Sequence, residues 1–105
     1  MATPLRLRTD RRDDGALVLI AAGELDLSNI GAFSDAIAHA ITAGVDGTLL
    51  HVDLSGVEYL DSGAINVLFD HADSIELVVN PILLPVLTVS GLTDVASVRA
   101  ASPDS

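Results

Sequence analysis

Apolar residues gather along this chain in short runs or at helical spacing, and glycine and proline residues separate the groups. Short apolar runs bounded by turn residues are typical of strands, whereas apolar positions three and four residues apart are typical of amphipathic helices. The pattern predicts strands over residues 5–9, 16–22, 48–54, 75–79 and 95–98. It predicts two longer helices with the apolar stripes Ile30, Phe33, Ile37, Ile41 and Ile65, Leu68, Phe69, Ala72.

Capping residues mark the expected ends of these two helices. Ser28 is expected to cap the first, which ends near Ala43-Gly44, and the second runs from Ser62 to about Asp73. Either Asp61 or Ser62 can cap the second helix, because both side chains offer an oxygen to the free N–H groups of the first turn. The same N–H groups and the helix dipole would also favour a phosphate on Ser62.

A third, shorter helix is expected after the strand at 75–79. Asn80 is placed to cap it, Pro81 suits the first helical position, and Gly91 would end it in the left-handed conformation. Pro85 lies inside this segment and lacks the N–H that a helix needs, so an extended segment is the competing prediction.

The order of these elements decides the predicted fold. Two strands followed by alternating helices and strands imply parallel strands joined by right-handed crossovers. We therefore predict a single α/β domain over residues 1–105, with a mixed, mostly parallel sheet of four to five strands and about three helices. The core is expected at about 5–98, with a turn at Asp13-Asp14-Gly15 and a frayed tail at 100–105.

The charge of the chain argues against nucleic acid as a direct partner. The formal net charge is −10, and four of the five arginines precede residue 13. An acidic surface of this kind repels phosphate backbones.

No apolar run approaches the roughly 18 residues of a membrane span, and the N-terminus lacks the apolar segment of a secretory signal. A cytoplasmic protein without a membrane partner is therefore expected.

Three kinds of chemistry find little support in the residues. A receiver domain phosphorylated on Asp53 would need a lysine to hold the acyl phosphate, and the chain contains none. A serine hydrolase is disfavoured because Ser62 follows Asp61 and is not set in a Gly-x-Ser-x-Gly elbow. The chain has no cysteine and its three histidines lack ligand spacing, so no metal site or other cofactor is expected.

Three segments in order resemble the landmarks of a STAS domain, and most closely those of bacterial anti-sigma factor antagonists. The segments are Gly23-Glu24-Leu25-Asp26, then His51-Val52-Asp53-Leu54-Ser55-Gly56-Val57-Glu58-Tyr59-Leu60-Asp61-Ser62, and finally Val89-Ser90-Gly91-Leu92. The resemblance covers about residues 16–98 and implies a STAS-like fold.

The resemblance also implies a function and a site. In that family an anti-sigma factor, itself a serine kinase, phosphorylates the serine after the aspartate, and a phosphoserine phosphatase resets it. Carried over, Ser62 is the phosphorylation site, and the unphosphorylated chain binds the anti-sigma factor and so regulates sigma-factor-dependent transcription. The expected contact residues are Asp26, Glu58, Asp61, Ser62 and Gly63.

Two departures from the family keep an alternative open. Many members read Asp-Ser-(Ser or Ala)-Gly, whereas Gly63 comes before Ala64 here. This order favours a STAS scaffold or small-ligand module whose serine is never phosphorylated. The segment at 82–89 is also more apolar than a surface helix needs, which leaves a homodimer contact, a partner contact and simple core as readings.

Overall fold

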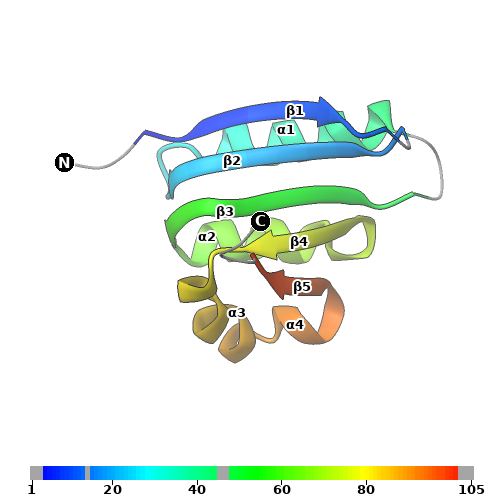
Figure 1. The fold of residues 1–105 in the computed structure, drawn as a ribbon. Helices are drawn as coiled ribbons and strands as arrows, with labels where there is room; N and C mark the ends of the chain where they lie inside the picture. Colours follow the sequence, from blue (N-terminus) through cyan, green and yellow to red (C-terminus); the bar gives the residue numbers. More distant parts are fainter. Residues whose placement is uncertain (1–3, 14, 45–47, 102–105) are drawn as a thin grey trace.

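A five-stranded sheet organises the computed structural model, which describes residues 4–13, 15–44 and 48–101 (Figure 1). The strands lie side by side in sequence order, from β1 to β5. β1 is antiparallel to β2, and the other neighbouring pairs are parallel. The mixed, mostly parallel sheet was therefore predicted correctly. The strands are β1 (Arg6–Arg11), β2 (Leu17–Leu25), β3 (Leu50–Leu60), β4 (Ile75–Val79) and β5 (Ser97–Ala100).

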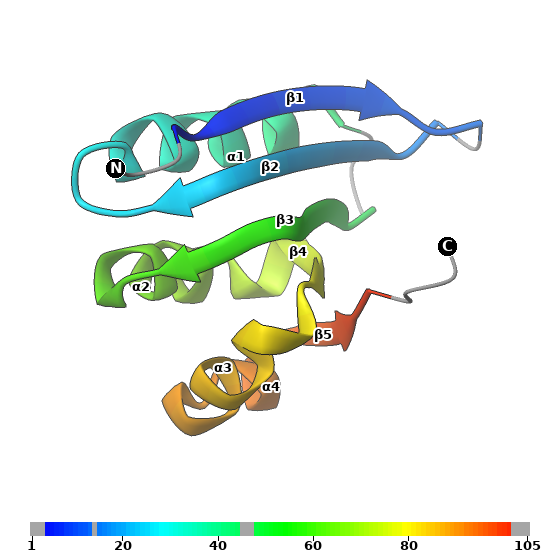
Figure 2. The same ribbon diagram turned by 60° about the vertical axis from the view of Figure 1, so that its left-hand side comes forward.

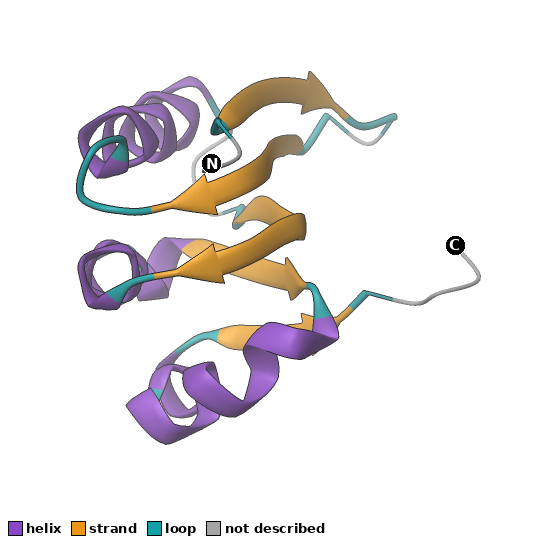
Figure 3. Ribbon diagram, turned by 90° about the vertical axis from the view of Figure 1, so that its left-hand side faces the viewer, coloured by secondary structure: helices purple, strands orange, loops and turns teal. Residues whose placement is uncertain are grey.

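Helices connect the parallel strands, and α1 and α2 lie together on one side of the sheet (Figure 3). The strands turn alternate side chains to that side, so Leu19, Val52 and Leu77 are almost fully buried. The helical segments are α1 (Ile30–Ala43), α2 (Ser62–Asp70), the 3₁₀ turn η1 (Ala72–Ser74), the 3₁₀ turn η2 (Pro81–Leu83), α3 (Leu84–Ser90) and α4 (Leu92–Val95). None of the helices in the described ranges is long and apolar enough to cross a membrane.

β2 and β3 are both longer than predicted. The stretch 55–59, expected as a bridge, continues β3, and residues 23–25 continue β2. Ser55 and Gly56 do not end β3, because the pairing of β2 with β3 shifts register at this point. Ile20 pairs with Asp53, and Ala22, two residues later, pairs with Gly56, three residues later. Such an irregularity lets a strand hold an extra residue without ending.

Both ends of the chain also differ from expectation. β1 and β5 each lie about two residues further along than the predicted strands. Ala100 belongs to β5, and the N–H of Ala101 donates to the carbonyl of Val79, so a frayed tail from residue 100 is wrong for these two positions. The remaining tail, 102–105, and Asp14 of the predicted turn lie outside the described residues. Gly15, with a φ of 88°, does take the left-handed conformation of a turn.

The ends of α1 and α2 correct two sequence predictions. Asn29, not Ser28, occupies the position before α1, and it makes no side-chain capping bond. The Ser28 hydroxyl instead donates to Asp26. In α2 the α-helical part stops at Asp70, and Phe69 is partly exposed and so lies outside the buried stripe.

The third helical region forms as the short, imperfect helix that was predicted, and the extended alternative is wrong. The Asn80 side chain accepts from the N–H of Ile82, and a 3₁₀ turn precedes α3. Pro85 then falls in the first turn of α3, where a missing N–H costs nothing. Gly91 ends α3 with a φ of 89°, as expected.

Candidate functional site

Two aspartates meet where β2 and β3 end. The two strands run parallel, so their carboxyl ends lie at the same edge of the sheet (Figure 2). Leu25 pairs with Leu60, and Asp26 and Asp61 are the next residues of their strands. The N–H of Asp61 donates to the carbonyl of Leu25 at 3.2 Å, which ties the two segments together. The fold therefore joins two acidic positions that are 35 residues apart in the sequence.

Asp61, rather than Ser62, caps α2. Its backbone is extended, and its Oδ1 accepts from the N–H of Ala64 at 3.0 Å. Ser62 is the first residue of the helix and is exposed. Within the described ranges its hydroxyl makes no hydrogen bond, because the cap is already supplied by Asp61. The oxygen of Ser62 is thus accessible and not committed to the fold.

Gly63 leaves room for two apolar side chains from the preceding segment. A Cβ at this position would come within 2.9 Å of Cδ1 of Ile30 and 3.4 Å of Cδ2 of Leu27. The glycine therefore leaves space directly after Ser62 for the ends of these two side chains. Ile30 is the first residue of α1, so this contact joins the starts of the two helices.

Asp26 begins a turn that its own side chain holds in place. Its Oδ1 accepts from both the N–H and the hydroxyl of Ser28. The hydroxyl bond is the larger cause, and together these bonds lower the pKa of the Asp26 carboxyl below its ordinary value. Asn29 completes the turn, because its amide donates to the carbonyl of Glu24 at 2.8 Å and its Oδ1 accepts from the N–H of Asp26 at 3.1 Å.

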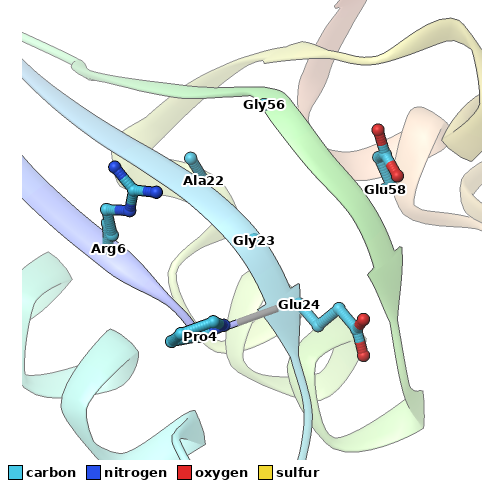
Figure 4. Close-up of a pocket in the computed structure, with 7 residues that line it drawn as sticks. All are labelled: Pro4, Arg6, Ala22, Gly23, Glu24, Gly56 and Glu58. Atoms are coloured by element: carbon cyan, nitrogen blue, oxygen red, sulfur yellow. The ribbon is translucent and has the colours of Figure 1, made fainter. Parts of the chain in front are cut away.

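Glu58 occupies a different setting from the other predicted contact residues. It lines a hollow of about 280 Å³ together with Arg6 of β1 and Glu24 of β2 (Figure 4). The floor of this hollow is formed by small residues of β2 and β3: Ala22, Gly23 and Gly56. Of the five predicted contact residues, the structure thus groups Asp26, Asp61, Ser62 and Gly63 at the strand ends and places Glu58 at the hollow.

Sequence reasoning missed two exposed apolar side chains near these residues. Leu27, which follows Asp26, is 79% exposed, and Tyr59, which follows Glu58, is 50% exposed. Leu27 could have been noticed in the sequence, because it falls outside the helical stripe that begins at Ile30. Tyr59 gives no comparable signal, since an aromatic residue in a strand usually indicates core.

The histidines do not form a cluster of metal ligands. His51 lies 3.1 Å from Glu76 on the neighbouring strand and 3.2 Å from an Arg12 nitrogen. Over the described part of the chain, no group of three or more His, Asp or Glu side chains is arranged to hold a metal ion. The strand ends thus bring two half-exposed carboxylates, Asp26 and Asp61, next to the exposed hydroxyl of Ser62.

Comparison with known proteins supports this picture of the fold. The family model described as "Mlab, STAS domain" matches residues 9–100. An anti-sigma factor antagonist from Mycobacterium paratuberculosis superposes with a TM-score of 0.82 at 21% identity, covering 99% of this chain and 93% of that one. The unphosphorylated anti-sigma factor antagonist SpoIIAA gives 0.71 at 18% identity, covering 94% and 90%. A putative antagonist from Thermotoga maritima gives 0.70 at 21% identity, covering 93% and 88%. A search among curated proteins gave no significant match.

Proposed function

The chain belongs to the STAS domain family, and on that basis we propose that it is an anti-sigma factor antagonist whose docking is controlled by phosphorylation of Ser62. The observation that carries the proposal is the exposed, uncommitted hydroxyl of Ser62 at the start of a helix that Asp61 already caps. Solved structures of similar fold are described as anti-sigma factor antagonists, and SpoIIAA is known in both unphosphorylated and phosphorylated forms.

In the unmodified state, the strand-end surface binds an anti-sigma factor and thereby frees a sigma factor. The same anti-sigma factor acts as the serine kinase, and a phosphoserine phosphatase restores the hydroxyl. The antagonist needs no catalytic group of its own in this scheme, because the kinase and the phosphatase supply the chemistry. The role places the protein in the cytoplasm, where sigma factors act.

Phosphorylation would release the partner by electrostatics. A phosphate adds about −1.5 to −2 charge, here beside the cap Asp61 and close to the turn that starts at Asp26. The free N–H groups at the start of α2 stabilise the modified serine itself. Repulsion and desolvation against a packed partner would have to weaken the binding free energy by about 3 kcal/mol to release the complex, because each 1.4 kcal/mol lowers the affinity tenfold.

The test is to incubate the protein with ATP and its candidate anti-sigma kinase, and to measure binding by calorimetry. We expect one phosphate on Ser62 by mass spectrometry, intact binding without release for Ser62→Ala, and weaker binding for Ser62→Asp. Ser97→Asp is the matched control, because Ser97 is an exposed serine of β5 at the far edge of the sheet. Equal affinities of the Ser62→Asp and Ser62→Ala variants would reject the mechanism.

A STAS scaffold or small-ligand module is the second candidate. The hollow beside Glu58 favours it, because a cavity of that size with charges of both signs can hold a small polar molecule. Tight binding of the kinase without any phosphate transfer to Ser62 would favour the scaffold over the switch.

A further inference from the structure

Leu27 is an apolar side chain in a position that folding does not explain. It lies in the loop between β2 and α1, is 79% exposed, and is absent from the buried core. A lone exposed leucine is common on protein surfaces and needs no explanation by itself. Leu27 differs because of the way its loop is held and because of its neighbours.

The loop presents Leu27 rigidly. Asp26 accepts two hydrogen bonds from Ser28, and Asn29 bonds to the backbone of Glu24 and Asp26. These bonds flank Leu27 on both sides and fix the backbone that bears it. A backbone held in place before binding loses little entropy when a partner covers the loop, which raises the affinity that Leu27 can contribute.

The neighbours of Leu27 place it at the phosphorylation site. Its Cδ2 lies 3.4 Å from the position that a Cβ of Gly63 would take, so it lies against the first turn of α2. Any macromolecule that covers Ser62 therefore meets Leu27 as well. Asp26 and Asp61 lie beside both, and carboxylates accordingly border this apolar side chain.

We propose that Leu27 is the anchor by which the anti-sigma factor holds the Ser62 surface. This inference rests on the proposed function and deepens it. The partner surface that fits has an apolar pocket for Leu27 and uncharged hydrogen-bond donors at its rim, opposite Asp26 and Asp61, so that no cation is available to pair with a phosphate on Ser62. Binding energy at protein interfaces is concentrated in a few buried anchors surrounded by polar contacts, and this arrangement matches that pattern.

The position of Leu27 also strengthens the switch. A phosphate on Ser62 must keep its water when no cation pairs with it. Burying Leu27 in the partner's pocket would remove water from the adjacent phosphate, so the anchor and the modified serine exclude each other. Binding of the partner through Leu27 and its release by phosphorylation of Ser62 are thus coupled, because the two side chains lie next to each other.

The experiment measures the affinity of Leu27→Ala for the anti-sigma factor by calorimetry. We expect a loss of about thirty-fold, which is typical of a hot-spot side chain. Val89→Ala is the matched control, because Val89 is 88% exposed on α3 and should change affinity less than twofold. Thermal unfolding of both variants should match the parent, since neither side chain is part of the core. Equal affinities of the Leu27→Ala and Val89→Ala variants would overturn the proposal.

Ser62→Asp in the same assay separates this inference from the proposed function. Weaker binding of Ser62→Asp together with unchanged binding of Leu27→Ala rejects the anchor and keeps the switch. A parent protein that fails to bind any anti-sigma factor rejects both.

Discussion

The turn at residues 26–29 and helix α3 both expose large apolar side chains, yet only the turn has the surroundings of a binding site. Leu27 is 79% exposed in the turn, and Val89 is 88% exposed on α3. On α3 the apolar sequence has a structural cause, because Leu87 on its inner side and Leu83, directly before the helix, are buried in the core. In the turn no core residue requires a leucine, and the backbone is nevertheless fixed by three polar side chains.

An exposed apolar side chain therefore indicates a binding site only where its backbone is held in place and polar or modifiable groups lie beside it. Part of segment 82–89 belongs to the core, so the simple-core interpretation of its apolar sequence holds for that part. Ile82, Val86 and Val89 remain exposed, and a homodimer through them stays a prediction. We expect four substitutions to show this difference between the turn and α3.

Leu87→Ala should destabilise the protein by about 2–5 kcal/mol, because it opens a cavity at a fully buried position. Urea unfolding measures this loss, and Val86→Ala on the exposed side of α3 should cost far less. At a temperature where the variant is folded, its affinity for the anti-sigma factor should equal that of the parent. Loss of affinity in a folded Leu87→Ala protein would show that α3 belongs to the contact surface and would contradict a binding site confined to the turn and its neighbours.

Asp61→Ala should lower the free energy of unfolding by about 1 kcal/mol, because it removes the acceptor for the N–H of Ala64. Asp61→Asn keeps an oxygen at the cap and should retain most of the stability. Thermal unfolding distinguishes the two variants. If the asparagine variant is as unstable as the alanine variant, the charge of Asp61 matters more than its cap.

Ser28→Ala should raise the pKa of Asp26 toward its ordinary value of 3.8, because it removes the hydroxyl bond, which favours the ionised carboxylate most, and leaves the bond from the backbone N–H. A depressed pKa in the folded state gives stability that is present above about pH 4 and is lost as the pH falls further. The Ser28→Ala variant should lose less stability as the pH falls. An NMR titration of the Asp26 carboxyl carbon measures the change in its pKa. Ser90→Ala, whose hydroxyl bonds to a carbonyl, serves as the control and should leave the Asp26 pKa unchanged.

Val89→Thr should have the smallest effect, within about 0.5 kcal/mol in stability, because the side chain is exposed and is not part of the core. Analytical ultracentrifugation of this variant measures whether the exposed side of α3 contributes to self-association. A change in oligomeric state would show that α3 does form a contact, between two copies of the chain.

Much of the fold followed from local patterns. The limits of β4 and the end of α3 at Gly91 were predicted to the residue, because a short apolar run and a left-handed glycine depend only on neighbouring residues. The length of β3 did not follow, because Ser55-Gly56 has the composition of a turn. Only the register shift against β2 shows that the strand continues through it.

The candidate site was predictable in its polar part and not in its apolar part. Ser62 and Asp61 stand next to each other in the sequence, so their helix start could be recognised, although which one caps could not. The contact between Leu27 and Gly63 joins residues 36 positions apart. Its existence depends on the pairing of β2 with β3, which no local pattern specifies.

Gly23 illustrates how mutational data on this protein should be interpreted. It takes a φ of 106°, and a Cβ there would come within 2.3 Å of the backbone oxygen of Pro4. A deep mutational scan would therefore score position 23 as intolerant for reasons of folding alone, even though it lies in the most recognisable motif of the chain. Measuring cellular abundance beside transcriptional output would separate such positions from those that act in signalling.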